Sequence, residues 1–184
     1  MKFGDDGRAQ STLVGAILLF AILIVAFSSY QAVVVPNQNS EVEFNHNQRV
    51  QGDMVEVRNE LLSTYTTGQD GYAEVELGTQ FPPRLVAINP PTPSGSFRTG
   101  QSRPIVVKTQ NGTDITADVL PGGVNDSRII SYTPTYSEYN SAGTLRYENS
   151  VAYHDFGDGL VQLTGQRLIQ NNTIQIVPVA AQFS

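Results

Sequence analysis

The chain has 184 residues, enough for about one ordinary domain with an appendage. It contains no cysteine and two histidines, which excludes a disulfide framework, a thiolate nucleophile and a cysteine-based zinc site. Its formal net charge is -6, with nine arginines and two lysines. Nucleic-acid binding is not expected, because neutralising phosphates needs clustered basic residues. Few lysines and an excess of acidic residues also suit a halophile protein.

The apolar residues are concentrated near the N-terminus. From Leu13 to Val35, 19 of 23 residues are apolar, and no residue from Ala9 to Ser40 is charged. A helix over residues 12–35 is about 36 Å long, more than the roughly 30 Å of a bilayer's hydrocarbon core. A buried core helix of this length needs a large apolar partner, which the polar remainder of the chain does not offer. This segment is therefore predicted to enter a membrane.

The flanking charges predict the orientation of this segment. Lys2 and Arg8 precede it, and no basic residue follows it until Arg49. The positive-inside rule then places the N-terminus inside and everything after Pro36 outside. A secretory signal peptide fits less well, because the apolar stretch is too long and no small-x-small cleavage site follows it.

Four residues directly before the apolar run indicate a more specific class. Arg8-Ala9-Gln10-Ser11 resembles the class III signal peptide of archaeal type IV pilin-like proteins, and the sequence that follows is similar to the start of many haloarchaeal members. In that family, cleavage follows a basic residue and a Gly or Ala, commonly just before a Gln. The resemblance implies that a prepilin peptidase cleaves between Ala9 and Gln10, so that residues 1–9 form a leader.

One mark of the bacterial relatives is missing. Bacterial pilins have a Glu at the fifth mature position, where this chain has Val14, although archaeal members do not generally share that Glu. An uncleaved single-pass anchor is therefore the alternative interpretation. If the chain is pilin-like, its apolar helices pack together in a filament core, with small residues permitting close approach. The residues expected at this membrane or packing surface are Leu13, Gly15, Ala16, Leu18, Phe20 and Leu23.

A second helical pattern follows the apolar run. Apolar residues recur at the spacing of one helical face: Val50, Met54, Val57 and Leu61. Charged residues occupy the other faces: Glu41, Glu43, Arg49, Asp53, Glu56, Arg58 and Glu60. Ser40 with Glu43 three residues on resembles a capping box, and Gly68 is a candidate stop. The pattern predicts an amphipathic helix over about residues 41–65, joined to the membrane helix with a bend at Pro36.

From Tyr72 onward, the chain changes to short strand-like runs separated by turn residues. These runs are Tyr72–Leu77, Arg84–Ile88, Ile105–Thr109, Ile115–Leu120, Arg128–Thr133, Thr144–Glu148, Val151–Asp155, Leu160–Thr164 and Thr173–Val179. Asn111-Gly112 and Gly157-Asp158-Gly159 predict hairpins between such runs. A spacing near ten residues predicts an antiparallel sandwich or barrel-like sheet, onto which the amphipathic helix packs.

The expected fold class is therefore α+β, with a long N-terminal transmembrane and amphipathic helix followed by an antiparallel β-rich head. Its expected parts are a class III leader (1–9), a transmembrane helix (10–36), an amphipathic helix (37–68) and an extracellular β domain (69–184). The chain ends almost directly after a strand-like run, so a further alternative is that it is the N-terminal part of a longer protein.

The only candidate for catalytic chemistry in the sequence is Tyr153-His154-Asp155, where a histidine lies beside carboxylates. No G-x-S-x-G elbow accompanies it, and neighbours on a strand point to opposite faces, so His154 and Asp155 are not expected to pair. Asp155, Asp158 and Glu148 are candidates for a weak calcium site, but the EF-hand pattern is absent. We expect no catalytic residue, no metal site and no cofactor, and hence no enzyme.

Three Asn-x-Ser/Thr sequons in predicted turns are candidate glycosylation sites: Asn111, Asn125 and Asn171. The pilin resemblance implies a structural subunit of an archaeal cell-surface filament, with an extracellular head for adhesion. Its implied partners are the membrane, copies of itself or related pilin-like subunits, and a prepilin peptidase. The alternatives are an uncleaved membrane-anchored β domain that binds an envelope component, a sugar or a protein, and a tethered hydrolase that uses His154.

Overall fold

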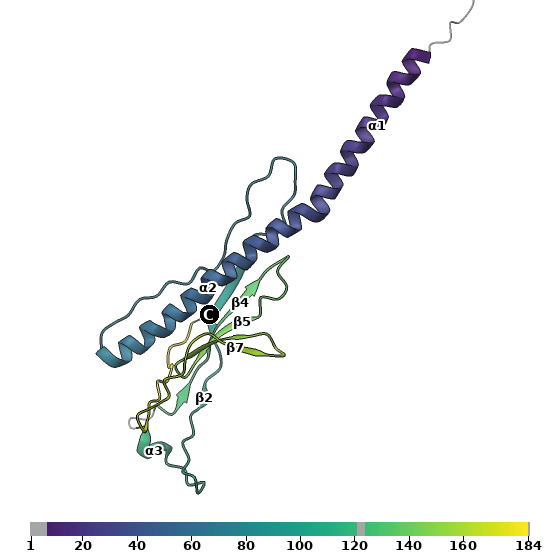
Figure 1. The fold of residues 1–184 in the computed structure, drawn as a ribbon. Helices are drawn as coiled ribbons and strands as arrows, with labels where there is room; N and C mark the ends of the chain where they lie inside the picture. The colour runs from purple at the N-terminus through teal and green to yellow at the C-terminus, as the bar shows by residue number, and fades with distance from the viewer. Residues whose placement is uncertain (1–6, 121–123, 184) are drawn as a thin grey trace, which may run out of the picture.

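A long N-terminal helix leads into a smaller β-rich head (Figure 1). The computed structural model describes residues 7–120 and 124–183. The helix runs without interruption through α1 (Gly7–Ser29), the π-helical turn η1 (Tyr30–Val34) and α2 (Val35–Thr67). The head that follows is built mainly from antiparallel strands. The α+β fold class predicted from the sequence is confirmed.

Pro36 is accommodated inside the helix by the widened turn η1. A proline in a helix has no N–H to donate, and its ring clashes with the carbonyl four residues earlier, here that of Ala32. In η1 the Val35 N–H donates to the Tyr30 carbonyl, one residue further back than in an α-helix. The helix axis changes direction here, so the expected bend lies in the turn before Pro36 (Figure 1). Because the helix continues, the expectation that Ser40 caps a new helix is wrong.

Gly68 ends α2 as predicted. Its φ of 69° is left-handed, and its N–H donates to the Thr64 carbonyl at 2.9 Å, a C-terminal cap that glycine adopts without steric cost. The chain then reverses direction and runs back along α2. Hydrogen bonds show this antiparallel course: they hold Glu76 against the middle of α2, and Ile88, further along the chain, against the earlier turn η1.

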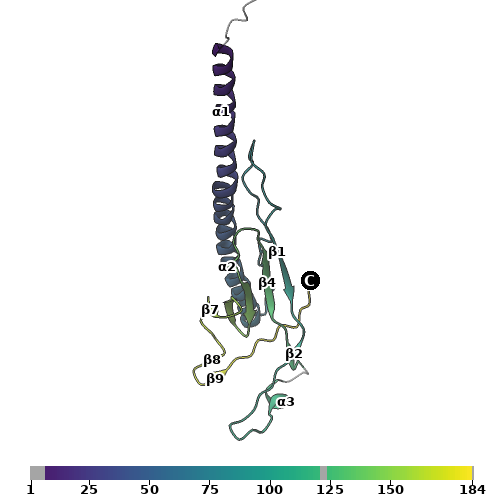
Figure 2. The same cartoon turned by 90° about the vertical axis from the view of Figure 1, so that its right-hand side faces the viewer.

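The main sheet of the head has five antiparallel strands in the order β1-β4-β5-β6-β7. They are β1 (Ser94–Thr99), β4 (Ile130–Thr135), β5 (Thr144–Glu148), β6 (Val151–Asp155) and β7 (Leu160–Gln162). Two smaller pairs and one helical turn lie at the far end of the head (Figure 2): β2 (Arg103–Pro104) with β3 (Asp126–Ser127), β8 (Ile169–Gln170) with β9 (Thr173–Ile174), and α3 (Thr116–Val119).

The strand predictions hold best where the hydrophobic alternation is regular. The runs 144–148 and 151–155 are β5 and β6 with their predicted bounds, and 128–133 and 160–164 overlap β4 and β7. The run 115–120 instead contains α3, and the Asp114 carboxylate accepts the N–H of Thr116, the first residue of this helical turn, at 2.9 Å.

Two further runs are extended segments without strand pairing. The run 72–77 packs along α2, and the Glu76 N–H donates to the Asp53 carboxylate at 2.9 Å instead of to a neighbouring strand. The run 84–88 lies between proline pairs, which lack the N–H groups that a ladder needs. Strand β1 is absent from the predictions because SGSFRT has one large apolar residue.

The core lies between α2 and one face of the sheet. Successive residues of β5 and β6 alternate between buried and half-buried, since the pleat directs them to opposite faces. The buried core residues are Val50, Met54 and Val57 from α2, with Ile130, Tyr132, Leu145, Tyr147 and Val179 from the head; Leu61 packs against them. The four-residue stripe of α2 therefore faces the sheet.

Candidate functional site: an apolar helix joined to the head

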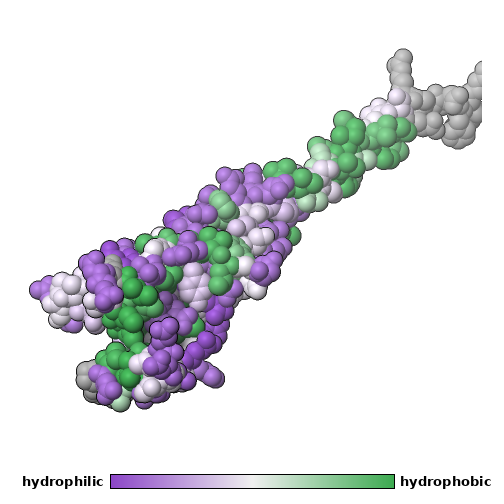
Figure 3. Space-filling view, turned by 60° about the horizontal axis from the view of Figure 1, so that its bottom comes forward, coloured by the Kyte–Doolittle hydropathy of each residue, from purple (hydrophilic) through white to green (hydrophobic). Residues whose placement is uncertain are grey.

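The helix α1 projects beyond the head with its apolar side chains exposed on all sides. No residue from 11 to 30 is buried, although most are large and apolar. Figure 3 shows this hydrophobic surface on the projecting helix, whereas hydrophilic and hydrophobic areas are mixed on the head. Burying one such side chain is worth about 1.5–3 kcal/mol, so this surface needs lipid or other helices around it. By length, composition and exposure, α1 is suited to anchoring the chain in a membrane.

The residues expected at the processing site begin this helix. The backbone of Arg8, Ala9 and Gln10 belongs to α1, and the Ser11 side chain is exposed. Residues 1–6 of the expected leader lie outside the residues that the structure describes.

The residues expected to pack helices together face open space. Leu13, Leu18, Phe20 and Leu23 are more than half exposed, and Ala16 is exposed as well. At Gly15, a Cβ atom would have no neighbour within 4 Å. The surface at Gly15 and Ala16, where the side chains are small, is therefore accessible to a neighbouring helix.

Between Val50 and Val35, polar residues continue the buried face of α2 toward α1. Asn39, Glu43, His46 and Asn47 are all fully buried. Glu43 accepts hydrogen bonds from the backbone N–H groups of Ser137, Glu138 and Tyr139 at 2.8, 2.8 and 2.6 Å. The expectation that Glu43 lies on an outer face of the helix is wrong, because a loop after β4 supplies the donors that a buried carboxylate requires.

His46 bonds to the head through both ring nitrogens. Nε2 lies 3.1 Å from the Glu76 carbonyl oxygen, which can only accept, so Nε2 carries the hydrogen. Nδ1 then accepts from the Tyr136 hydroxyl at 2.6 Å. Burial lowers the pKa of His46 and raises the pKa of Tyr136. Both rings are therefore held neutral, as the hydrogen-bond pattern requires.

Further groups on the helix bind the head or the returning chain. Arg49 pairs with the Glu76 carboxylate at 2.8 Å, which lowers the pKa of Glu76. Arg58, also expected on an outer face, is buried and donates to the carbonyls of Ser150 and Gly165, each at 2.9 Å. Asp53, described above, also binds the returning chain, and so does Gln31, which binds the Ile88 backbone.

The result of these contacts is a head fixed along one side of the helix from η1 to the end of α2. The apolar half of α2 is predictable from its spacing. The polar half is missed because Asn, Glu and His are normally exposed. The available signal is the spacing itself, since residues 39, 43, 46 and 47 continue the stripe upstream of Val50.

His154 is buried on the helix-facing side of β6. Its Nε2–H donates to the Ala142 carbonyl, its ring lies 4.0 Å from the Phe156 ring, and burial lowers its pKa. Asp155 faces the other side and pairs with Arg146 at 3.0 Å. His154 and Asp155 therefore do not pair, as the strand geometry predicts.

Two of the three carboxylates considered for calcium have other contacts. Asp155 binds Arg146 and the Gly157 N–H, and Glu148 accepts from the Tyr153 hydroxyl at 3.4 Å. Among the residues that the structure describes, no group of three or more His, Cys, Asp or Glu side chains could hold a metal ion.

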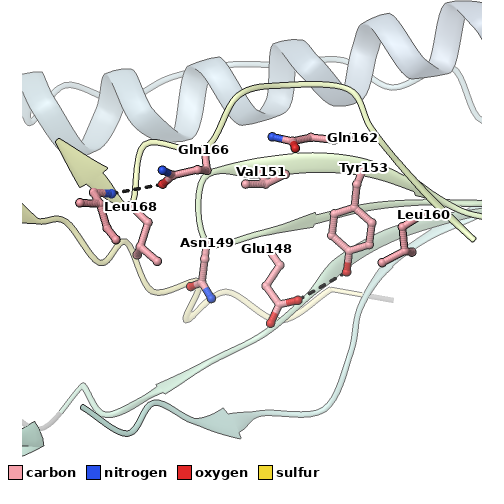
Figure 4. Close-up of a pocket in the computed structure, with 9 residues that line it drawn as sticks. Glu148, Asn149, Val151, Tyr153, Leu160, Gln162, Gln166 and Leu168 are labelled. Carbon is pink, nitrogen blue, oxygen red and sulfur yellow. Dashed lines mark hydrogen bonds between the residues drawn. The ribbon is translucent and has the colours of Figure 1, made fainter. Parts of the chain in front are cut away.

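A hollow of about 640 Å³ lies on the face of the sheet away from α2 (Figure 4). The Tyr153 hydroxyl and the Glu148 carboxylate meet inside it, and burial raises the pKa of Tyr153. Its lining is Glu148, Asn149, Val151, Tyr153, Leu160, Gln162, Gln166, Leu168 and Ile169. This mixture of apolar walls and a few polar groups is typical of small-ligand sites.

The three sequon asparagines are all exposed. Asn111 lies in a turn, Asn125 directly precedes β3, and Asn171 lies in the turn between β8 and β9. All three side chains are thus accessible to a modifying enzyme.

Comparison with known proteins identifies an archaeal relative. An uncharacterized protein of Archaeoglobus fulgidus is 34% identical over 186 aligned positions, which cover 97% of this chain. The chain spans about 30% of the length of that relative. No protein-family model and no solved structure matches the chain.

Proposed function

We propose that this chain is a pilin-like structural subunit of an archaeal cell-surface filament or a related assembly. The observation that carries the proposal is the continuous helix: the large apolar side chains from Leu13 to Phe27 are exposed, and the second half of the helix is built into a β-rich head. Such a helix exchanges lipid for neighbouring copies when subunits assemble. The motif Arg8-Ala9-Gln10-Ser11 directly before the apolar run and the archaeal origin of the relative support the same assignment.

The work of such a subunit is mechanical. The precursor is held in the bilayer by α1, with its N-terminus inside and its head outside. Cleavage after Ala9 frees the helix for assembly, and Gly15 and Ala16 let neighbouring helices approach closely. The head then forms the outer surface of the filament for adhesion, with glycans at the three exposed sequons.

Mass spectrometry of the mature N-terminus, with the chain expressed in an archaeal host that has a prepilin peptidase, tests this proposal. We expect a chain that begins at Gln10. The variant Ala9→Leu removes the small residue before the cut and is expected to keep residues 1–9. The variant Ala16→Leu, the same change beyond the cut, is expected to be processed normally. A native chain that retains residues 1–9 contradicts the filament proposal.

The hollow on the free face of the sheet favours a second candidate, an uncleaved anchored domain that binds an envelope component, a sugar or a protein. The two candidates differ in their assembled form. Filaments sheared from cells pellet without detergent, whereas an anchored monomer stays with the membrane and needs detergent for extraction.

A further inference from the structure

The segment between residues 79 and 93 runs from the head back along the helix toward α1 (Figures 1 and 2). It carries three strongly exposed apolar side chains, with Leu85 104% exposed, Val86 74% and Ile88 80%. Large apolar side chains grouped in this way on a solvent-exposed surface indicate a contact with a partner or a membrane.

Two hydrogen bonds fix the position of this apolar group along the helix. The Gln31 Nε2 group donates to the Ile88 carbonyl at 2.9 Å, and the Ile88 N–H donates to Gln31 Oε1 at 3.1 Å. Gln31 lies in η1, before the apolar run ends at Val35. The group 85–88 is therefore held at the level of the last turns of the apolar segment.

The composition of the segment suits a lipid interface. Arg84 is its single charged residue, and the guanidinium turns to the helix, where it donates to Asn39 Oδ1 at 2.9 Å and Gln38 Oε1 at 3.0 Å. No charged residue occurs from 85 to 93. Proline pairs on both sides restrict the backbone of the segment: Pro82, Pro83, Pro90 and Pro91.

We propose that Leu85, Val86 and Ile88 insert into the head-side interface of the bilayer in which α1 is anchored. The chain then contacts the membrane at two places, and this fixes the orientation of the head relative to the membrane surface. The occupant is lipid because the group lies beside the apolar run, which in the inserted chain is surrounded by lipid at that depth. The proposal rests on the anchoring of α1 in the proposed function, and neither cleavage nor polymerisation is required for it.

The absence of cysteine allows single labels at chosen positions. The full chain is reconstituted at one copy per nanodisc, with an environment-sensitive fluorophore at Val86→Cys and, in a second variant, at Leu85→Cys. Ile174→Cys is the matched control, because Ile174 is an apolar residue 58% exposed in the β8–β9 pair. Phe20→Cys reports whether α1 itself is in the bilayer. Nitroxide-bearing lipids and aqueous iodide serve as quenchers.

We expect lipid nitroxides to quench the labels at positions 85 and 86 several-fold more than the label at position 174, and iodide to show the reverse order. Labels at 85 and 86 that behave like the one at 174, while Phe20→Cys is quenched by lipid, overturn the proposal and leave the anchor intact. A Phe20→Cys label that escapes lipid quenching overturns the anchoring itself. Shielding that appears only in assembled filaments identifies a second copy as the occupant and also overturns the proposal.

Discussion

At the scale of single residues, the buried polar face of α2 explains how the head is held on its helix. A buried charge is tolerated only when its partners are supplied, and Glu43 receives three backbone N–H groups from residues 137–139. His46 is satisfied in the same way from two directions, by Tyr136 and by the Glu76 carbonyl. These bonds join segments far apart in the sequence and fix the rotation of the helix against the sheet.

Replacing Glu43 with Gln is expected to destabilise the head. The amide turns an NH₂ group toward backbone donors, and a buried donor without an acceptor costs about 1–3 kcal/mol. The measurement is the free energy of unfolding of the full chain in detergent. It is obtained from a denaturant titration in which the circular-dichroism signal of the β-sheet is monitored. Glu41→Gln, two residues away and exposed, is the matched control and is expected to change stability little. Equal stability of the two variants contradicts the role assigned to Glu43.

The two buried histidines predict acid sensitivity. Burial lowers the pKa of His46 and of His154 below the ordinary value of 6.5. At a pH between the lowered pKa and 6.5, the unfolded chain therefore binds protons that the folded chain does not. The free energy of unfolding is therefore fully retained above pH 6.5 and falls as the pH drops below it. The slope is at most about 1.4 kcal/mol per pH unit for each histidine.

Unfolding midpoints of the full chain in detergent, measured between pH 7.5 and pH 5, check this expectation. The double variant His46→Gln/His154→Gln is expected to flatten the fall in this window, and each single variant to remove part of it. The Glu76 carboxyl does not interfere, because its pKa is lowered from 4.5 by Arg49. An unchanged slope in the double variant assigns the pH dependence to other groups.

At the scale of elements, β1 depends on a glycine under an aromatic ring. Gly95 faces α2 from β1, next to Tyr132 of β4, whose ring is fully buried. A Cβ at residue 95 would overlap the Tyr132 ring. Backbone and ring can approach this closely because residue 95 has no side chain.

Gly95→Ala is expected to destabilise the sheet by about 1–3 kcal/mol, the usual cost of overpacking a core. Gly100→Ala, just after the other end of β1, is the control, because its Cβ would lie an ordinary 3.6 Å from the Ile129 carbonyl oxygen. Thermal unfolding of the two variants measures the difference. A Gly95→Ala variant as stable as Gly100→Ala shows that the Tyr132 ring can move aside.

At the scale of the whole molecule, one continuous helix serves two environments. Its first half exposes apolar side chains, and its second half covers one face of the sheet. The turn η1 accommodates Pro36 between the two halves without interrupting the helix, so the anchoring half and the head-binding half belong to one continuous helix. Anchoring by α1 can therefore be tested by introducing one charged residue into this helix.

Leu18→Arg is expected to reduce membrane insertion, because an arginine at the centre of a spanning helix costs about 2.5–3.5 kcal/mol. Leu160→Arg places the same residue on the exposed surface of β7 and is expected to leave insertion unchanged. The fraction of chain that stays in the membrane after alkaline carbonate extraction gives the comparison. If both variants remain equally in the membrane, α1 is not the anchoring segment.

The sequence by itself determines the apolar helix, the end of the amphipathic helix at Gly68 and the strands β5 and β6. Each depends on local composition or on a short-range period: an uncharged run, a left-handed glycine cap, and alternation over neighbouring strands. The physical causes act within a few residues, so they can be read directly from the chain.

Only the tertiary structure decides which polar side chains are buried and where the segment 79–93 lies. Glu43 carries the same charge as Glu41, and what separates them is a loop more than ninety residues further along the chain that supplies backbone donors. The strand-like run 72–77 stays unpaired because Asp53 takes the Glu76 N–H, and Ile88 reaches the end of the membrane segment because Gln31 binds it. A polar group is stable inside a protein only when its partner is present, and the partner's position is set by the fold.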